Sequence, residues 1–233
     1  VVEEPKAVYF ADFADNLPNL SLHMHHRKFP GKWVWQYRPF DFGDGDGAGI
    51  ALGNEEKDEY FPTMRTKGYP STIGRIWDSY GEEIRLWSRK FNVPVELILA
   101  CIATESGGKR EARREEPGWI SDDQTPHRVS VGLMQVLIST ARSTLSDPDI
   151  DAEWLNIPSN SIQAGTAYIA IQERKTGFDP PLVAAAFNSG GIYKQNGEEN
   201  KFKLRNYPIG TSHHIERFCS WFGDALHITR QET

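Results

Sequence analysis

The stretch that decides the fold is VPVELILACIATESGG, residues 93–108. Pro94 suits the first turn of a helix, and apolar residues then recur every three or four positions, which predicts a helix with one buried face. Glu105 shares that face with Ile98 and Ile102, and the Ser-Gly-Gly that follows ends the helix. A glutamate at the end of a core-facing stripe loses solvent, which raises its pKa and lets it hold a proton near neutral pH. Glycoside cleavage needs such a general acid, although an ion-paired glutamate at a helix end fits the same pattern.

Helical spacing continues on both sides of this segment, so we expect a mainly α fold. Ser71 or Thr72 can cap a helix that runs to Pro94, and Asp179 can cap another that stops at the Gly-Gly pair after Ser189. The other expected helices cover residues 131–145, 151–155, 160–175 and 212–226.

Residues 1–70 differ from the rest, because they are rich in aromatic residues, glycine and aspartate and contain few helical patterns. The alternation over residues 32–37 predicts a short strand, and the five glycines in the segment from Phe42 to Gly53 predict a loop. We therefore divide the chain into an N-terminal extension, 1–70, of unknown role with little regular structure beyond one hairpin, and a helical catalytic domain, 71–233. We expect the domain to fold without the extension, at some loss of stability.

The composition excludes several classes of protein. Hydrophobic residues make up 39% of the 233, too many for a disordered chain. The net charge of −6 argues against a general nucleic-acid binder, which needs a basic surface. No apolar run approaches the roughly 18 residues that a membrane-spanning helix requires.

Four blocks together resemble one family. They are ATESGG (103–108), SVGLMQV (130–136), SIQAGTAYI (161–169) and AAAFNSG (184–190). Their order and content are similar to the Glu-Ser, Gly-Leu-Met-Gln, Asn-Ile-x-x-Gly-x-x-Tyr-Leu and Ala-Ala-Tyr-Asn-Ala-Gly segments of lytic transglycosylases of the soluble-lytic-transglycosylase (SLT) type, relatives of goose-type lysozyme. The resemblance spans roughly residues 75–226 and implies a lysozyme-like fold.

The resemblance also implies an activity: cleavage of the β-1,4 bond between N-acetylmuramic acid and N-acetylglucosamine in peptidoglycan. In the family one glutamate first protonates the glycosidic oxygen and then takes the proton of the muramyl 6-hydroxyl, which closes a 1,6-anhydro ring. Glu105 carries both roles over to this chain, with no metal and no cofactor. The implied place of action is the periplasm, the outside of the cell or a phage particle, with secretion or phage machinery as possible partners.

The family pattern assigns five neighbours to Glu105. Ser106 would orient the carboxyl by a hydrogen bond. Gln135 and Asn188 would bind N-acetyl or hydroxyl groups of the sugars. Met134 and Tyr168 would form apolar walls that keep the carboxyl poorly solvated.

The chain departs from the family in two places. The 27 positions from Glu105 to Gly132 are more than the family leads us to expect, and the insert, 109–129, is either a surface loop or an added groove wall that meets the acidic stem peptide. A family tyrosine that points at the glutamate matches Tyr207 by its neighbouring residues or His214 by its place at the start of the last helix, with a slight preference for Tyr207.

Two rival functions stay open. Simple hydrolysis would need a second carboxylate to activate water, for which Asp122 and Asp123 in the insert are the candidates. A non-catalytic glycan-binding or structural component of a cell-wall-crossing machine would not need a proton donor, so Glu105 argues against it.

The two cysteines, Cys101 and Cys219, should lie close together, because in the family the last helix packs near the catalytic helix. Whether they form a disulfide stays open.

Two weaker metal patterns are set aside. Asp44, Asp46, Gly49 and Glu55 match four positions of a calcium loop whose fifth position is an alanine, so a Gly/Asp turn is favoured. His23, His25 and His26 fit a surface cluster better than a metal site.

Overall fold

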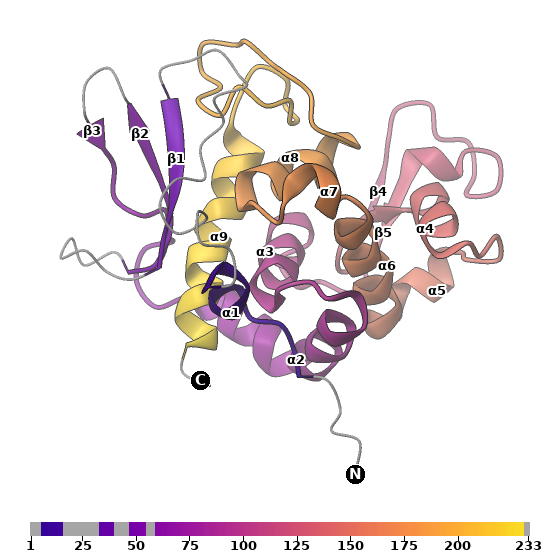
Figure 1. Ribbon diagram of the computed structural model, residues 1–233. Coiled ribbons are helices and arrows are strands. Elements are labelled where there is room, and N and C mark those ends of the chain that lie inside the picture. The colour runs from indigo at the N-terminus through magenta and orange to yellow at the C-terminus, as the bar shows by residue number, and fades with distance from the viewer. Residues whose placement is uncertain (1–5, 16–32, 40–46, 55–58, 231–233) are drawn as a thin grey trace.

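Helices dominate the computed structural model, which describes residues 6–15, 33–39, 47–54 and 59–230 (Figure 1). The helices are α1 (Phe10–Asp15), α2 (Ser71–Phe91), α3 (Val95–Glu105), α4 (Ile138–Leu145), α5 (Ala152–Asn156), α6 (Pro158–Ile171), α7 (Glu173–Thr176), α8 (Pro180–Ser189) and α9 (His213–Thr229), with a short 3-10 turn, η1 (Pro126–Arg128). One antiparallel sheet joins β1 (Trp33–Arg38), β2 (Gly49–Asn54) and β3 (Glu59–Tyr60), and a second joins β4 (Arg113–Glu115), β5 (Val129–Val131) and β6 (Val136–Leu137). The expected mainly α fold is confirmed.

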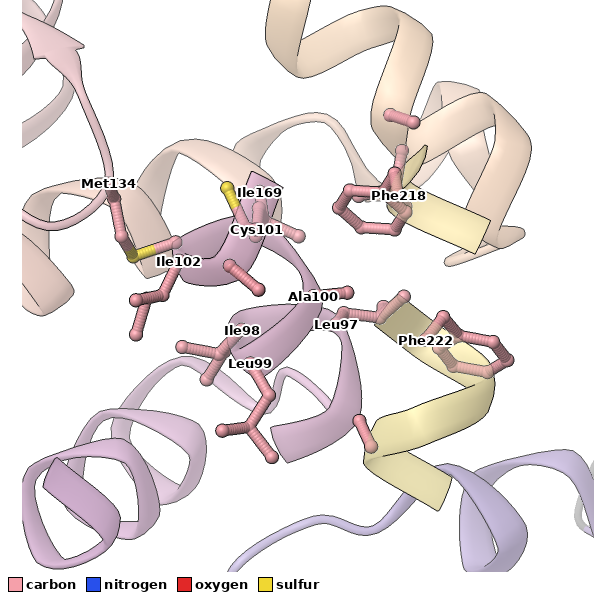
Figure 2. Close-up of a cluster of buried hydrophobic side chains, with 14 of the residues drawn as sticks. Leu97, Ile98, Leu99, Ala100, Cys101, Ile102, Met134, Ile169, Phe218 and Phe222 are labelled. Carbon is pink, nitrogen blue, oxygen red and sulfur yellow. The ribbon is translucent and has the colours of Figure 1, made fainter. Parts of the chain in front are cut away.

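Helix α3 lies at the centre of the core. Every residue from Val95 to Thr104 is buried, which is typical of a helix surrounded by other elements. It packs against α2 and α9, and Figure 2 shows its apolar side chains beside Phe218 and Phe222 of α9. The first residue of α3 with notable exposure is Glu105, so the core delivers this carboxyl to the surface. Within the described residues, no helix is long and apolar enough to cross a membrane.

Cys101 lies on α3 and Cys219 on α9, and the expected packing of these two helices against each other is confirmed. Both thiols are buried and free, so the disulfide that the sequence left open is not formed.

Most expected helices are present, with corrections at their ends. Neither Ser71 nor Thr72 caps α2, because both lie inside the helix and Pro70 occupies the cap position. The expected helix over 131–145 is wrong in its first half, where the chain forms β5, a turn and β6 before α4 begins. The turn needs a positive φ of 82° at Gly132, where a Cβ atom would lie 2.3 Å from the carbonyl oxygen of Leu155, and such a backbone cannot continue a helix.

The insert is an ordered part of a sheet. Arg114 of β4 pairs with Ser130 of β5, and β5 in turn pairs with β6. Figure 1 shows this sheet beside α4 and α6, far from the sheet of the N-terminal extension.

The N-terminal extension holds the expected strand and hairpin, but Gly49–Asn54 is a buried strand where a loop was expected. Glycine suits this strand because Gly49 lies against the backbone of Gly223 in α9. Asp44, Asp46 and Glu55 of the calcium-like pattern lie outside the described residues, as do His23, His25 and His26.

The extension also provides hydrogen bonds to three buried carboxylates of the helical domain. Glu96 accepts from the backbone N–H of Phe10 at 2.8 Å, and Asp179 accepts from the indole N–H of Trp35 at 2.9 and 3.0 Å. Asp224 in α9 accepts from the backbone N–H of residue 66 at 3.1 Å. A buried carboxylate without a donor is costly. The packing therefore argues against our expectation that residues 71–233 fold alone, although the boundary at residue 70 stays a prediction.

Candidate active site

Glu105, the last residue of α3, lies in a pocket of about 580 Å³. Its side chain keeps only 18% of its surface exposed, and this burial raises its pKa from 4.5 to about 7. The positive charges of Arg217 and Arg114 act in the opposite direction and lower the pKa, but burial is the larger effect. The pocket therefore holds a carboxyl that is protonated below neutral pH. The lining residues are Glu105, Arg114, Glu116, His127, Ser130, Gln135, Val136, Leu137, Thr140, Tyr168, Phe187, Asn188, Ser189, Gly190 and Tyr207.

His214 is the side chain that lies against this carboxyl. Its Nε2 atom is 3.5 Å from Oε1 of Glu105 and has no hydrogen-bond partner among the described residues. Burial and the charge of Arg217 lower the pKa of His214 to about 4, so between about pH 4 and pH 7 a neutral ring faces a protonated Glu105. Helix α9 fixes the ring, because His214 is its second residue and its backbone N–H donates to Asn206.

The structure therefore places His214, the less favoured of the two sequence candidates, against Glu105. Tyr207 lies elsewhere in the same pocket with 53% of its surface exposed. Its backbone N–H donates to Oδ1 of Asn188 at 2.7 Å, which joins the segment before α9 to the end of α8.

The role expected for Ser106 is wrong. Its hydroxyl donates to the carbonyl oxygen of Leu133 at 2.7 Å and of Ile102 at 3.2 Å, and accepts from the N–H of Gly108. These bonds tie the end of α3 to the turn between β5 and β6. Ser106 thus positions the backbone beside Glu105 and does not bind the carboxyl.

Met134 is also misplaced by the sequence interpretation, because it is fully buried and belongs to the core cluster with Ile102 and Ile169 (Figure 2). The sulfur lies so close to Gly165 of α6 that a Cβ there would be 2.4 Å away, which explains the glycine. Gln135, the next residue, does line the pocket.

The amide of Gln135 is used by the protein itself. Its N–H groups donate to the carbonyl oxygens of Ala112 at 2.8 Å and Gly132 at 2.9 Å, and its oxygen accepts from the hydroxyl of Ser130. Gln135 thus links the turn between β5 and β6 to Ala112, the residue before β4. Sugar binding by Gln135 stays a prediction.

Tyr168 of α6 and Asn188 of α8 both line the pocket, as expected. The ring of Tyr168 packs edge-on against that of Phe187, with 5.4 Å between the centroids. Tyr168, Phe187 and Asn188 line the pocket together with Tyr207, and we call these four residues the aromatic wall.

The insert contributes Arg114, Glu116 and His127 to the lining, and we call these three residues the charged wall. Glu116, His127 and the aromatic Phe187 line the pocket but are not predicted as site residues by the sequence. Arg114 and Glu116 are two positions apart, which would place them on the same face of a strand. Strand β4 has only three residues, however, too few to be recognised from the sequence.

Asp122 and Asp123 do not take the place expected of a second catalytic carboxylate. Asp122 is held by Arg113 through two bonds of 2.7 and 3.0 Å and accepts from the indole of Trp119, which lowers its pKa. Asp123 is exposed. The carboxylates that line the pocket, among the described residues, are those of Glu105 and Glu116.

Comparison with known proteins places this geometry in context. A family model described as the transglycosylase SLT domain matches residues 82–208, a range that includes every residue lining the pocket. Among solved structures, an inactive mutant of the lytic transglycosylase Slt from Pseudomonas aeruginosa is similar, with 16% identity and a TM-score of 0.43 over 70% of this chain. The match covers 24% of that protein, so this chain spans about a quarter of its length.

Proposed function

The chain belongs to the transglycosylase SLT domain family, whose model matches more than half of it, and on that premise we propose that it is a peptidoglycan lytic transglycosylase. The bond cleaved is the β-1,4 link between N-acetylmuramic acid and N-acetylglucosamine. The observation that carries the proposal is the carboxyl of Glu105, whose pKa burial raises to about 7 inside the pocket. The place of action is the bacterial cell envelope, where this substrate lies.

In the first step Glu105 acts as a general acid. Its protonated carboxyl donates to the glycosidic oxygen as the bond to the muramyl C1 breaks, and the leaving sugar departs with a hydroxyl group. The burial that raises the pKa supports this step, because it keeps the proton in place near neutral pH. The neutral ring of His214 supports it too, since an imidazolium would favour the ionised carboxyl.

In the second step the carboxylate of Glu105 acts as a base. It accepts the proton of the muramyl 6-hydroxyl while O6 bonds to C1, which closes the 1,6-anhydro ring and restores the acid. The charges of Arg217 and Arg114 stabilise the carboxylate between the steps. Arg217 is positioned for this by a hydrogen bond to the carbonyl oxygen of Thr104, the residue before Glu105.

The aromatic wall suits the sugars. Tyr168, Phe187 and Tyr207 offer ring surfaces for the apolar faces of pyranose rings, and Asn188 offers an amide N–H for hydroxyl or N-acetyl oxygens.

A hydrolytic muramidase is the second candidate, and the presence of Glu116 in the pocket favours it over the earlier candidates Asp122 and Asp123. Its carboxylate, however, is already engaged in an ion pair, with Oε1 of Glu116 3.0 Å from Nε of Arg114.

Mass spectrometry of the products separates these functions. Purified sacculi digested with the protein should release fragments that end in 1,6-anhydro-N-acetylmuramic acid. Fragments with a reducing end, heavier by one water, would instead identify a hydrolase. No fragments at all would support a glycan-binding component without activity.

A further inference from the structure

A second pocket lies against α9, and none of the described residues lines both this pocket and the one around Glu105. Its volume is about 540 Å³, which is within the range of sites that hold small molecules. Part of its lining is a stripe along α9, where positions 213, 216, 217, 220 and 221 follow helical spacing. The rest comes from residues 65–66 of the N-terminal extension. We call this cavity the second pocket.

Arg217 is the cation that the second pocket offers to a ligand. The residue is exposed, and the hydrogen bond to the carbonyl oxygen of Thr104 is the one that joins its guanidinium to the described residues. A guanidinium has five N–H donors in a planar fork, which matches the two oxygens of a carboxylate. Arg65 differs, because its Nε atom lies 3.8 Å from Oδ1 of the buried Asp224. A carboxylate can therefore bind Arg217 without displacing a carboxylate of the described residues.

Two other lining residues limit what this ligand can be. Glu216 adds a carboxylate to the lining, where it accepts from the hydroxyl of Ser212 at 3.0 Å. A second negative charge on the ligand would be repelled by it. Trp221 is half-buried and offers an apolar ring surface. The lining therefore fits one carboxylate joined to an apolar group better than a dianion such as phosphate.

Arg217 also connects the second pocket to the first. It donates to Thr104, the residue before Glu105, and its positive charge lowers the pKa of the Glu105 carboxyl. A negative charge bound at Arg217 would offset this effect, so Glu105 would keep its proton to a higher pH.

The other charged or titratable groups around Glu105 do not line the second pocket, so a ligand there would act mainly through Arg217. These groups are Cys101, Arg114, Glu116, His127, Tyr168 and His214.

We propose that the second pocket is a binding site for a monocarboxylate that carries an apolar group, and that its occupation acts on Glu105 through Arg217. The carboxylate binds the guanidinium of Arg217, and the apolar group lies against Trp221. The inference goes beyond the proposed cleavage reaction, because both of its parts are measured without a glycan.

Phenylacetate is the probe for the first part, and a calorimetric titration of the full chain measures its Kd. Binding should be saturable, and the neutral analogue phenylacetamide should bind about fivefold more weakly, which is the scale of an exposed ion pair. Inorganic phosphate should also bind more weakly than phenylacetate. Equal binding of phenylacetamide, tighter binding of phosphate or no saturable binding of phenylacetate would overturn the proposal.

Two substitutions locate the probe. Ser220→Leu places a larger side chain in the second pocket without changing a charge, and should raise the Kd of phenylacetate by about tenfold. Arg217→Gln should raise it by about fivefold. Ser143→Leu is the matched control, because Ser143 of α4 also donates to a carbonyl oxygen of its own helix but lines neither pocket. An unchanged Kd in either variant, shown to be folded by circular dichroism, would place the probe elsewhere and overturn the proposal.

The second part is tested by an NMR titration of the Glu105 side-chain carboxyl carbon. With phenylacetate bound, the midpoint should rise by about half a pH unit, the scale of one partly exposed charge pair. Ser220→Leu should abolish this rise and Ser143→Leu should keep it. A midpoint that bound phenylacetate leaves unchanged would overturn the action on Glu105. Failure to cleave sacculi would remove the proposed function but leave these results standing.

Discussion

At the scale of single residues, the chemistry depends on opposing effects at one carboxyl. Burial raises the pKa of Glu105 to about 7, whereas Arg217 and Arg114 lower it. Without burial the residue would have lost its proton at neutral pH, and without the arginines its carboxylate would be harder to form once the proton is transferred. The balance suits a residue that must be an acid and then a base within one turnover.

The pH dependence of cleavage should reflect Glu105 and His214. The acid form of Glu105 is present below its pKa of about 7, so kcat/KM should fall as the pH rises above 7. His214 gains a proton near pH 4, and its positive charge 3.5 Å away weakens the carboxylate as a base, so activity should also fall below that pH. A pH profile measured on solubilised glycan strands checks both limbs.

His214→Gln serves as the control for this profile, since glutamine does not titrate. The alkaline limb should remain and the acidic limb should disappear. If activity of the wild-type protein already fell above pH 4.5, the ordinary pKa of a glutamate, burial would not raise the pKa of Glu105. An acidic limb that persists in the variant would assign it to another group.

At the scale of elements, the hairpin from β5 to β6 and the end of α3 are fixed to each other. Ser106, just after α3, donates to Leu133 in the turn of the hairpin. Gln135 of the same turn donates to Gly132 within it and to Ala112 of the insert. Both polar side chains are thus bonded to the protein's own backbone, whereas the family pattern assigned Ser106 to the carboxyl of Glu105 and Gln135 to the sugars.

The hydrogen bond from Trp35 of β1 to Asp179, at the start of α8, leads to a quantitative prediction about stability. Trp35→Phe removes the indole N–H that donates to the buried carboxylate of Asp179. The free energy of unfolding should fall by about 1–3 kcal/mol for the unsatisfied carboxylate, in addition to the lost packing. Chemical denaturation measures the change.

Trp87→Phe is the matched control, because it removes the same atoms from a half-buried indole whose N–H donates to the neutral hydroxyl of Ser159. Its effect should be clearly smaller. Equal losses in the two variants would mean that the Asp179 bond contributes nothing beyond tryptophan packing.

The predictability of the elements varied with their length. Helices α2, α3 and α9 were recognised because their apolar residues repeat over several turns. Strands β4 to β6 have two or three residues each, too few for alternation to be visible, so residues 131–137 were mistaken for the start of a helix. The positive φ at Gly132 and Gln135 that forms the turn is not encoded in any periodicity.

The site residues that could be predicted lie in the four sequence blocks that resemble the SLT family. Glu105, Tyr168 and Asn188 reach the pocket as expected. Met134 does not, because its residue type alone cannot distinguish a groove wall from the core beneath it. The charged wall was missed because tertiary pairing, rather than local sequence, brings the insert to Glu105.

At the scale of the whole molecule, the described N-terminal residues pack into the same core as the helices. Phe10 of α1 packs edge-on against Phe222 of α9, with ring centroids 4.8 Å apart, and β2 packs on α9 as well. The buried Glu96, whose pKa burial raises to about 7, accepts from both Phe10 and Thr229. The two ends of the described chain thus meet at one buried carboxyl.

Removal of residues 1–70 should therefore cause a large loss of stability. The deletion exposes the apolar face of α9 and leaves Glu96, Asp179 and Asp224 without donors that they now have, each at a cost of about 1–3 kcal/mol. Such a sum is comparable to the whole stability of a typical domain. A fragment 71–233 that is soluble, helical by circular dichroism and unfolds cooperatively near the wild-type temperature would contradict this account.

The central claim is that Glu105 performs the proton transfers, and its most direct test is the rate at which the Glu105→Gln variant releases muropeptides from purified sacculi. The amide keeps the shape of the side chain but cannot give and regain a proton, so the rate should fall by roughly 10²–10⁴-fold while circular dichroism stays unchanged. Glu115→Gln, which alters an exposed carboxylate of β4 paired with Arg113, should keep the wild-type rate. A folded Glu105→Gln variant that releases muropeptides near the wild-type rate would contradict the account.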